Sequence, residues 1–178
     1  MRKIIITYGL ISGTIVAALM FATMSLYKTN ILSHSNGEVI GYTTMVIALS
    51  LVFFGVRSCR DNYFNGVLTF GQGLKIGLLI SLISALMYAL AWEVCYNTFM
   101  SGFAEEMANN YLDEIKASGK SAADINAAVA QMESFKVWYK NPVLRFGMTL
   151  LEILPVGIVI SLISAALLRK KGSVQSIA

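Results

Sequence analysis

Four stretches of this chain are apolar over lengths that a compact water-soluble core does not require. They run from Ile4 to Leu26, from Val39 to Val56, from Ile76 to Met100 and from Val143 to Leu168. A helix needs about 20 apolar residues to cross a hydrocarbon core of about 30 Å, and irregular backbone is excluded there because its polar groups would stay unpaired. The sequence therefore predicts an all-α fold, an integral membrane bundle of four transmembrane helices that forms a single domain over residues 1–178.

The composition and charge of the chain also indicate a protein that lies in a lipid bilayer. Hydrophobic residues make up 56% of the chain and charged residues only 13%. The net charge of +4 does not indicate nucleic-acid binding, because the basic residues sit at the edges of apolar runs and form no water-facing patch. The first apolar run follows Arg2 and Lys3 as in a signal peptide, but it exceeds the usual apolar core of about 7–15 residues, so we expect a retained anchor.

Basic residues beside the four stretches predict an orientation, since Lys and Arg prefer the cytoplasmic side. With four crossings, one side receives Arg2, Lys3, Arg57, Arg60, Lys75, Arg169, Lys170 and Lys171. The other side receives Lys28 and a long segment whose lysines are offset by acidic residues. We therefore expect a multi-pass protein with both termini in the cytoplasm.

The polar segment 101–141 is predicted to form an extracytoplasmic helical hairpin between the third and fourth spans. Apolar residues recur about every four positions in its first half, which favours an amphipathic helix that continues the third span outward. Ser121 and Asp124 resemble a capping box at the start of a second helix, and Asn141 before Pro142 predicts its end. The expected apolar stripes are Phe103, Met107, Tyr111 and Ile115, then Ile125, Val129, Met132, Phe135 and Tyr139.

Glu93 and Glu152 are the first candidates for function, because a carboxylate within a span costs about 2–3 kcal/mol even on insertion scales. The predicted topology places both at similar depth in the outer half of the membrane. If they face each other, they could form a proton-relay or cation site. Alternatively, Glu152 pairs with Arg145 on its own helix, and Glu93 bonds to Tyr96, Asn97 or Tyr88, so that the network only fixes helix packing. A lipid or small-ligand site near the external surface is the third possibility.

Two further features concern the membrane helices. Pro155, followed by Gly157, removes the amide partner of the Leu151 carbonyl and predicts a helix kink. Small residues also recur at intervals of four, which lets helices approach closely and could equally serve a second copy of the chain. These stripes are Gly9, Gly13 and Ala17, then Gly73, Gly77, Ser81, Ala85 and Ala89, then Gly157, Ser161 and Ala165.

A hexapeptide occurs twice, from Ile80 to Ala85 and from Ile160 to Ala165, which is either an inverted transporter repeat or a chance recurrence. Between the second and third spans, Arg57 and Arg60 are candidates for lipid phosphates, although topology-setting charges explain them equally well. His34 is the only histidine, and Cys59 and Cys95 have no metal-ligand spacing. We therefore predict no metal, no cofactor and no catalytic residues.

Several of these residues together resemble the family of small bacterial inner-membrane proteins called domain of unknown function 4199. The resemblance rests on Ile40 to Met45, Arg57 to Asp61, Thr69 to Gly71 with Lys75 and Gly77, and a last span containing Asn141, Pro142, Arg145, Phe146, Glu152, Pro155, Val156 and Gly157. It implies a four-span protein of a bacterial inner membrane, with no assigned activity.

The first functional hypothesis is a non-enzymatic structural or interaction subunit, whose hairpin meets a membrane partner protein and whose small-residue stripes form homo-oligomer contacts within the lipid bilayer. The second is a small proton- or cation-coupled transporter or channel that uses the intramembrane glutamates. An enzyme acting on lipid is the third, and the sequence shows no nucleophile motif for it.

Overall fold

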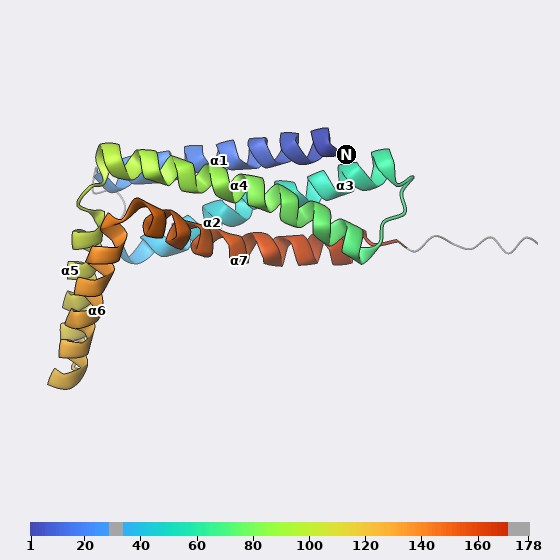
Figure 1. Cartoon of the computed structure of the whole chain (residues 1–178). Helices are drawn as coiled ribbons and strands as arrows, with labels where there is room; N and C mark the ends of the chain where they lie inside the picture. Colours follow the sequence, from blue (N-terminus) through green and yellow to red (C-terminus); the bar gives the residue numbers. More distant parts are fainter. Residues whose placement is uncertain (29–33, 171–178) are drawn as a thin grey trace, which may run out of the picture. The chain divides into compact units, whose positions relative to one another are not determined.

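The computed structural model describes residues 1–28 and 34–170, with side chains described outside residues 27–38. Lys171 and the side chains of Lys28 and His34 therefore lie outside the described part. The described residues form helices and no strand (Figure 1). The helices are α1 (Arg2–Lys28), α2 (His34–Leu49), α3 (Leu51–Tyr63), α4 (Phe70–Phe99), α5 (Phe103–Ala117), α6 (Ala122–Lys140) and α7 (Pro142–Leu168).

Four helical segments of the described chain are long and apolar enough to cross a membrane, which confirms the predicted number of spans. They are Arg2–Leu26, Val39–Tyr63, Phe70–Phe99 and Pro142–Leu168. The second runs through α2 and α3, which meet at Ser50. Apolar patterning thus located every span.

The connection between the second and third spans is shorter than expected. We placed the end of the second span at Val56 because charges follow, but α3 continues to Tyr63 and carries Arg57 and Arg60 on its last turns. Arginine is a good helix former and its long side chain reaches the membrane surface from within a helix, so it does not end one. The helix ends where Asn65 and Gly66 adopt φ values of 48° and 79°, which right-handed helices exclude.

The described chain divides into two compact units, Met1–Ala89 with Leu150–Ala178, and Leu90–Thr149. In the first unit, glycines let helices pack closely. A Cβ atom added to Gly9 or Gly13 of α1 would lie 2.7 Å from Ile83 Cβ or 2.6 Å from Met87 Sδ of α4. The stripe on α1 therefore packs against a neighbour in the same chain.

The stripes of α4 and α7 pack against each other in the same way. A Cβ on Gly77 would lie 2.9 Å from Ser161 Cβ, and one on Gly157 would lie 2.8 Å from Ser81 Cβ. Contacts within the chain thus occupy these stripes, and a homo-oligomer contact through them stays a prediction. Sequence spacing cannot distinguish the two uses, because both require small residues every four positions.

Serine hydroxyls supply hydrogen bonds between helices of the first unit. Ser12 Oγ donates to the Ala48 carbonyl at 2.8 Å, and Ser84 Oγ donates to the Gly9 carbonyl at 3.1 Å. Ser81 and Ser161, the second residues of the two hexapeptide copies, lie with their hydroxyl oxygens 3.2 Å apart. The two copies of the hexapeptide therefore contact each other where α4 packs against α7, so the repeat has a role in packing.

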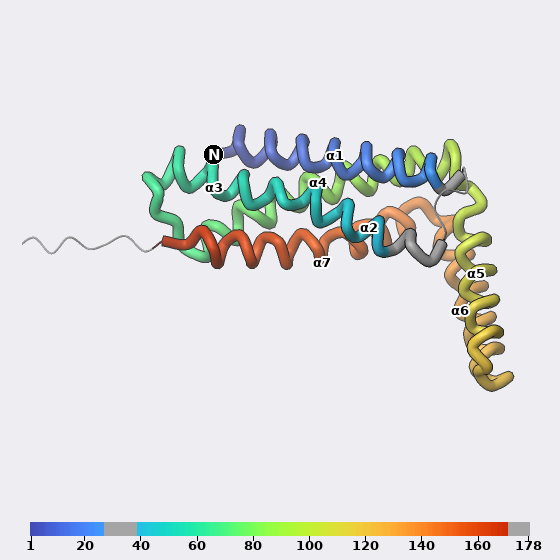
Figure 2. Tube along the Cα trace, turned by 180° about the vertical axis from the view of Figure 1, so that it is seen from behind, coloured from blue at the N-terminus to red at the C-terminus, as the bar shows by residue number. Residues whose placement is uncertain are grey.

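The basic ends of the first unit lie together. Figures 1 and 2 show the N-terminus, the α3–α4 connection and the end of α7 at one end of its bundle. These segments and the helix turns beside them carry Arg2, Arg57 and Arg60 of α3, Lys75 of α4, and Arg169. A further contact joins two of them, where the Lys170 amide donates to the Leu68 carbonyl at 2.9 Å.

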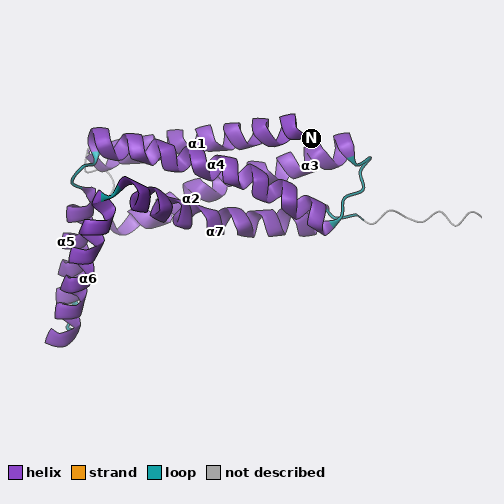
Figure 3. Ribbon diagram, viewed as in Figure 1, coloured by secondary structure: helices purple, strands orange, loops and turns teal. Residues whose placement is uncertain are grey.

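The second unit contains α5 and α6, which form the predicted helical hairpin (Figure 3). Gly119, at φ 70°, lies in the turn between them. Ser121 Oγ accepts from the Asp124 amide and donates to its carboxylate, so the predicted start of α6 is confirmed. Which side of a membrane the hairpin occupies stays a prediction.

Two details of the hairpin differ from expectation. The third span does not continue into α5, because α4 ends at Phe99 and a turn containing Gly102 intervenes. The buried face of α5 consists of Ala104, Ala108 and Ile115, while Met107 and Tyr111 are 39% and 38% exposed. The small alanines explain the shift, because they allow a closer approach to α6 than the larger residues would.

Candidate functional site

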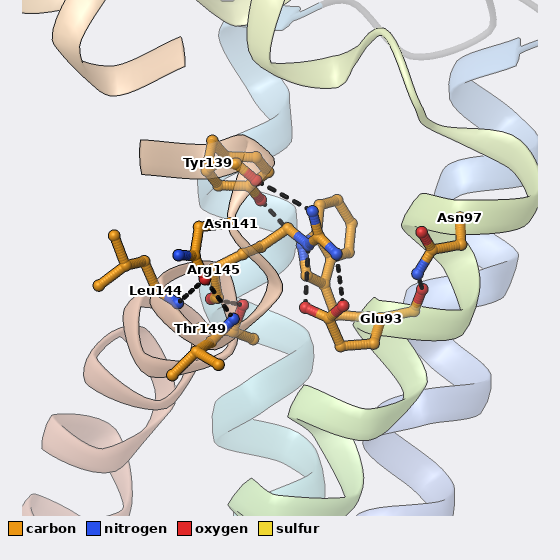
Figure 4. A network of polar contacts seen from close by, with 9 residues as sticks. Glu93, Asn97, Tyr139, Asn141, Leu144, Arg145 and Thr149 are labelled. Atoms are coloured by element: carbon orange, nitrogen blue, oxygen red, sulfur yellow. Dashed lines mark hydrogen bonds and ion pairs between the residues drawn. The ribbon is translucent and has the colours of Figure 1, made fainter. Parts of the chain in front are cut away.

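A buried ion pair is the centre of the candidate site, and it lies entirely in the second unit (Figure 4). Arg145 Nε, from the start of α7, donates to Glu93 Oε1 of α4 at 2.9 Å, and a second guanidinium nitrogen donates to Glu93 Oε2. The Arg145 side chain is 3% exposed and that of Glu93 is 19% exposed. Two parallel bonds fix both position and direction, which a lysine could not do.

The guanidinium has two further partners. Its remaining terminal nitrogen donates to the main-chain carbonyl of Tyr139 at 2.9 Å, near the end of α6. Its central carbon lies 3.8 Å from the centre of the Tyr96 ring, a cation–π contact. Arg145 therefore joins α4, α6 and α7 at one point.

Aromatic side chains surround this point. Trp92 Nε1 donates to the Tyr139 hydroxyl at 2.8 Å. The Tyr139 ring centre lies 5.6 Å from Tyr96, 5.7 Å from Phe103 and 5.1 Å from Phe135. These rings exclude water and lower the local dielectric, which strengthens the ion pair relative to one at a surface.

Local sequence explains how Arg145 reaches this position. Asn141 ends α6 in an extended conformation, as a residue before proline prefers, and also caps α7. Its Oδ1 accepts from the Val143 amide at 2.9 Å and from the Leu144 amide at 3.4 Å. Pro142 takes the first helical position, where no amide donor is needed. The chain turns within one residue, and Arg145 follows in the first turns of α7.

The predicted pairing of Arg145 with Glu152 is wrong, because the guanidinium takes Glu93 as its carboxylate partner. Asn97, one of the three residues expected to bond to Glu93, does so at the main chain, where its Nδ2 donates to the Glu93 carbonyl at 2.7 Å. The expected pair of Arg145 and Glu152 was inferred from the spacing of the two residues along one helix. Seven residues along α7 span about 10 Å, whereas α4 brings a carboxylate directly to the guanidinium.

Glu152 belongs to the first unit, where its side chain is exposed on α7. Pro155 and Gly157 follow it within the same unbroken helix. A direct pairing of Glu152 with Glu93 stays a prediction, as does a kink at Pro155. Glu93 itself forms an ion pair with Arg145, whose positive charge balances the negative charge of the carboxylate.

Arg57 and Arg60 lie on α3, where both approach Asp61. Arg60 Nε donates to Asp61 Oδ1 at 2.7 Å, and Arg57 Nε lies 3.8 Å from Asp61 Oδ2. Their role toward lipid phosphates stays a prediction, and a carboxylate between them reduces the positive charge that they offer.

Sequence reasoning missed Tyr139 and Trp92 as parts of the site. Tyr139 was assigned only to an apolar stripe, and Trp92 was passed over beside Glu93. Thr149, whose Oγ1 donates to the Arg145 carbonyl at 3.0 Å, was also missed. An aromatic residue next to an intramembrane acid is a signal that could have identified Trp92, because Trp combines a large apolar surface with one donor.

A groove with a volume of about 350 Å³ lies between α5 and α6 in the hairpin. Its lining combines polar and apolar side chains, including Tyr111, Ile115, Lys120, Asp124 and Gln131. Within the described residues, no group of three or more His, Cys, Asp or Glu side chains could hold a metal ion. The site thus consists of the buried ion pair between Arg145 and Glu93 and of the adjoining hairpin with its open groove.

These features define a class: a helical bundle with four helices of membrane-spanning length and hydropathy, and a helical hairpin fixed by an arginine–glutamate pair. The chain belongs to the family described as protein of unknown function (DUF4199), whose model matches residues 7–170. No curated protein and no solved structure matches it.

Proposed function

We propose that this chain is a non-enzymatic interaction subunit of a bacterial inner membrane, which holds its hairpin in a fixed position for a partner protein. The contacts of Arg145 support this proposal. One guanidinium binds the Glu93 carboxylate and the Tyr139 carbonyl and stacks on Tyr96, so that its charge and donors serve to join helices. A proton-relay acid needs a carboxylate that is free to exchange partners, whereas both carboxylate oxygens of Glu93 accept hydrogen bonds from Arg145.

The arrangement of basic residues supports the proposed orientation. Arg2, Arg57, Lys75 and Arg169 belong to segments at the same end of the first unit (Figure 1). Since clustered Lys and Arg mark the cytoplasmic side, the N-terminus and the end of α7 face the cytoplasm. The hairpin, reached after an odd number of crossings, then lies outside.

Site-specific photo-crosslinking in native membranes tests the function. A photoreactive residue at Gln131, which lines the groove, is expected to give one discrete crosslinked product with a protein partner. The same residue at Leu162, on an exposed apolar position of α7, serves as the control and is expected to give none. Arg145→Gln is expected to abolish the product while the protein remains in the membrane. No discrete product at Gln131 or at further groove positions would refute the proposal.

A second candidate, proton or cation transport, is favoured by one observation. Glu152 is an exposed carboxylate on a span, three residues before Pro155. Ionisable residues within spans mark ion pathways in many transporters. Flux into liposomes containing the purified protein decides the matter: loss of flux in Glu152→Gln, or in Glu93→Gln, favours transport. Flux equal to that of empty liposomes, with the variants folded, excludes simple conduction.

A further inference from the structure

Large apolar side chains are exposed where α6 ends and α7 begins. Val137 and Trp138 are 68% and 57% exposed, and Val143 and Leu144 are 77% and 46% exposed. We call these four residues the junction patch. The hairpin does not bury them, because Phe135 and Tyr139 occupy the packed side of α6 and successive helical residues turn by about 100°.

Near Val137 and Trp138, the exposed side of α6 carries one carboxylate, that of Glu133, and one ammonium, that of Lys140. Ser134 and Asn141, which lie three residues before Val137 and three after Trp138, are exposed and uncharged. Lys136 is turned toward Glu133, with Nζ 2.6 Å from Oε1. Two adjacent large apolar side chains that are each more than half exposed are unusual on a helix surface that faces bulk water.

One half of the patch already belongs to a membrane span. Val143 and Leu144 are in the first turns of Pro142–Leu168, the most hydropathic of the four candidate spans. If α7 crosses the bilayer, their exposed surfaces meet lipid. Val137 and Trp138 precede them closely in the sequence, and Lys140 is the one charged residue of the stretch between the two pairs.

Trp138 and Lys140 give this surface the composition of a bilayer boundary. Tryptophan is enriched at headgroup level, where its ring meets lipid carbon and its N–H meets water. Lys140 is exposed, and a lysine at this depth can lay its stem along the apolar surface with its ammonium among phosphates. Lipid suits this patch better than a partner protein does, because the patch adjoins a candidate membrane span along the chain.

We propose that the junction patch is a membrane-surface anchor: the last two turns of α6 lie in the phospholipid headgroup region, with Val137 and Trp138 facing the acyl chains. Typical insertion of such a helix face is about 5–10 Å into the headgroup boundary. The anchor does not depend on the side of the membrane or on the partner of the hairpin. It fixes the end of α6 at the lipid surface, directly beside the Arg145 contact with Tyr139.

Tryptophan fluorescence tests the anchor, because Trp92 and Trp138 are the only two tryptophans in the chain. In Trp92→Phe, reconstituted into phosphatidylcholine–phosphatidylglycerol vesicles, Trp138 is the sole reporter. We expect strong quenching by lipids brominated near the glycerol end of the acyl chain and weak quenching by aqueous iodide. Strong iodide quenching with no effect of brominated lipid would overturn the proposal. Trp138→Phe, which leaves the buried Trp92, provides the reference for a shielded indole.

A spin label at position 137 supplies a second measurement that leaves Trp92 intact. Cys59 and Cys95 are both buried, so Val137→Cys offers the accessible thiol. We expect relaxation of this label by oxygen, which partitions into lipid, to exceed relaxation by a water-soluble nickel chelate. Asn110→Cys, on the exposed side of α5, is the control and should show the reverse. A label at position 137 that is relaxed mainly by the chelate, or that neither reagent reaches because protein covers it, would also overturn the lipid anchor.

Discussion

Arg145 and Glu93 meet across 52 positions of sequence in a bidentate ion pair, and the Tyr139 carbonyl and the Tyr96 ring complete the surroundings of the guanidinium. Because these partners come from α4 and α6 while Arg145 belongs to α7, the pair is a structural joint at the base of the hairpin. The contribution of this pair to the free energy of unfolding can be measured separately from any function.

Removal of one member of this pair is expected to destabilise the protein strongly. Glu93→Gln leaves a buried guanidinium without its counter-ion, a change that costs about 3–5 kcal/mol in other proteins. Arg145→Lys keeps the charge but loses the two-bond geometry, so we expect an intermediate effect. Thermal unfolding in detergent, followed by the resistance of the hairpin to proteolysis, measures both.

A matched control is available in the same hairpin. Lys136→Gln removes the ion pair with Glu133, whose side chain is 63% exposed, and exposed pairs contribute only about 0–1 kcal/mol. If Lys136→Gln lowered the unfolding temperature as much as Glu93→Gln, the special weight given to the buried pair would be refuted.

Alanine substitutions at two glycines of α4 should have opposite signs. Gly77→Ala places a Cβ 2.9 Å from Ser161 Cβ, and such overpacking costs about 1–3 kcal/mol. Gly71→Ala meets nothing within 4 Å and should stabilise the helix by about 0.5–1 kcal/mol. Unfolding in detergent compares the two, and equal effects would mean that α4 and α7 are not in close contact at Gly77.

The hydrogen bond from Trp92 to Tyr139 should appear as a coupling free energy. Trp92→Phe and Tyr139→Phe each remove one partner, and we expect the double variant to be less destabilised than the sum by about 0.5–1.5 kcal/mol. A double-mutant cycle on unfolding free energies gives this value directly. A coupling near zero would show that the two side chains do not interact in solution.

Asn141 should be sensitive to loss of its acceptor oxygen. Asn141→Ala removes the cap of α7 and is expected to cost about 0.5–2 kcal/mol, whereas Asn141→Asp keeps the acceptor and should be nearly neutral. Hydrogen exchange at the Val143 and Leu144 amides reports the change locally. Unchanged exchange in Asn141→Ala would contradict the cap.

Sequence reasoning predicted the spans well because membrane insertion depends on length and hydropathy, which a sequence shows directly. It placed the end of the second span at Val56 because a charged residue was taken as a boundary, although Arg57 continues the helix. The cap at Ser121 was found because it depends on residues three apart.

The partner of Arg145 could not be predicted in the same way. Intrahelical spacing favoured Glu152, since the sequence contains the distance along α7 but not the distance from α7 to α4. Glu93, Tyr96 and Tyr139 meet Arg145 only through tertiary packing. The stripes of small residues posed the same problem, because their spacing does not say whether the partner helix belongs to the same chain.

The contact between the hexapeptide copies allows more than one alignment of α7 along α4. Gly77 lies against Ser161, Gly157 against Ser81 and Gly73 against Ala165. If α7 slid by four residues, or about 6 Å, Gly77 would meet Ala165 and Ala85 would meet Gly157, again small residue against small residue. The glycines therefore set the separation of the two helices but not their register. The bond from the Lys170 amide to the Leu68 carbonyl, at the end of α7, selects one alignment.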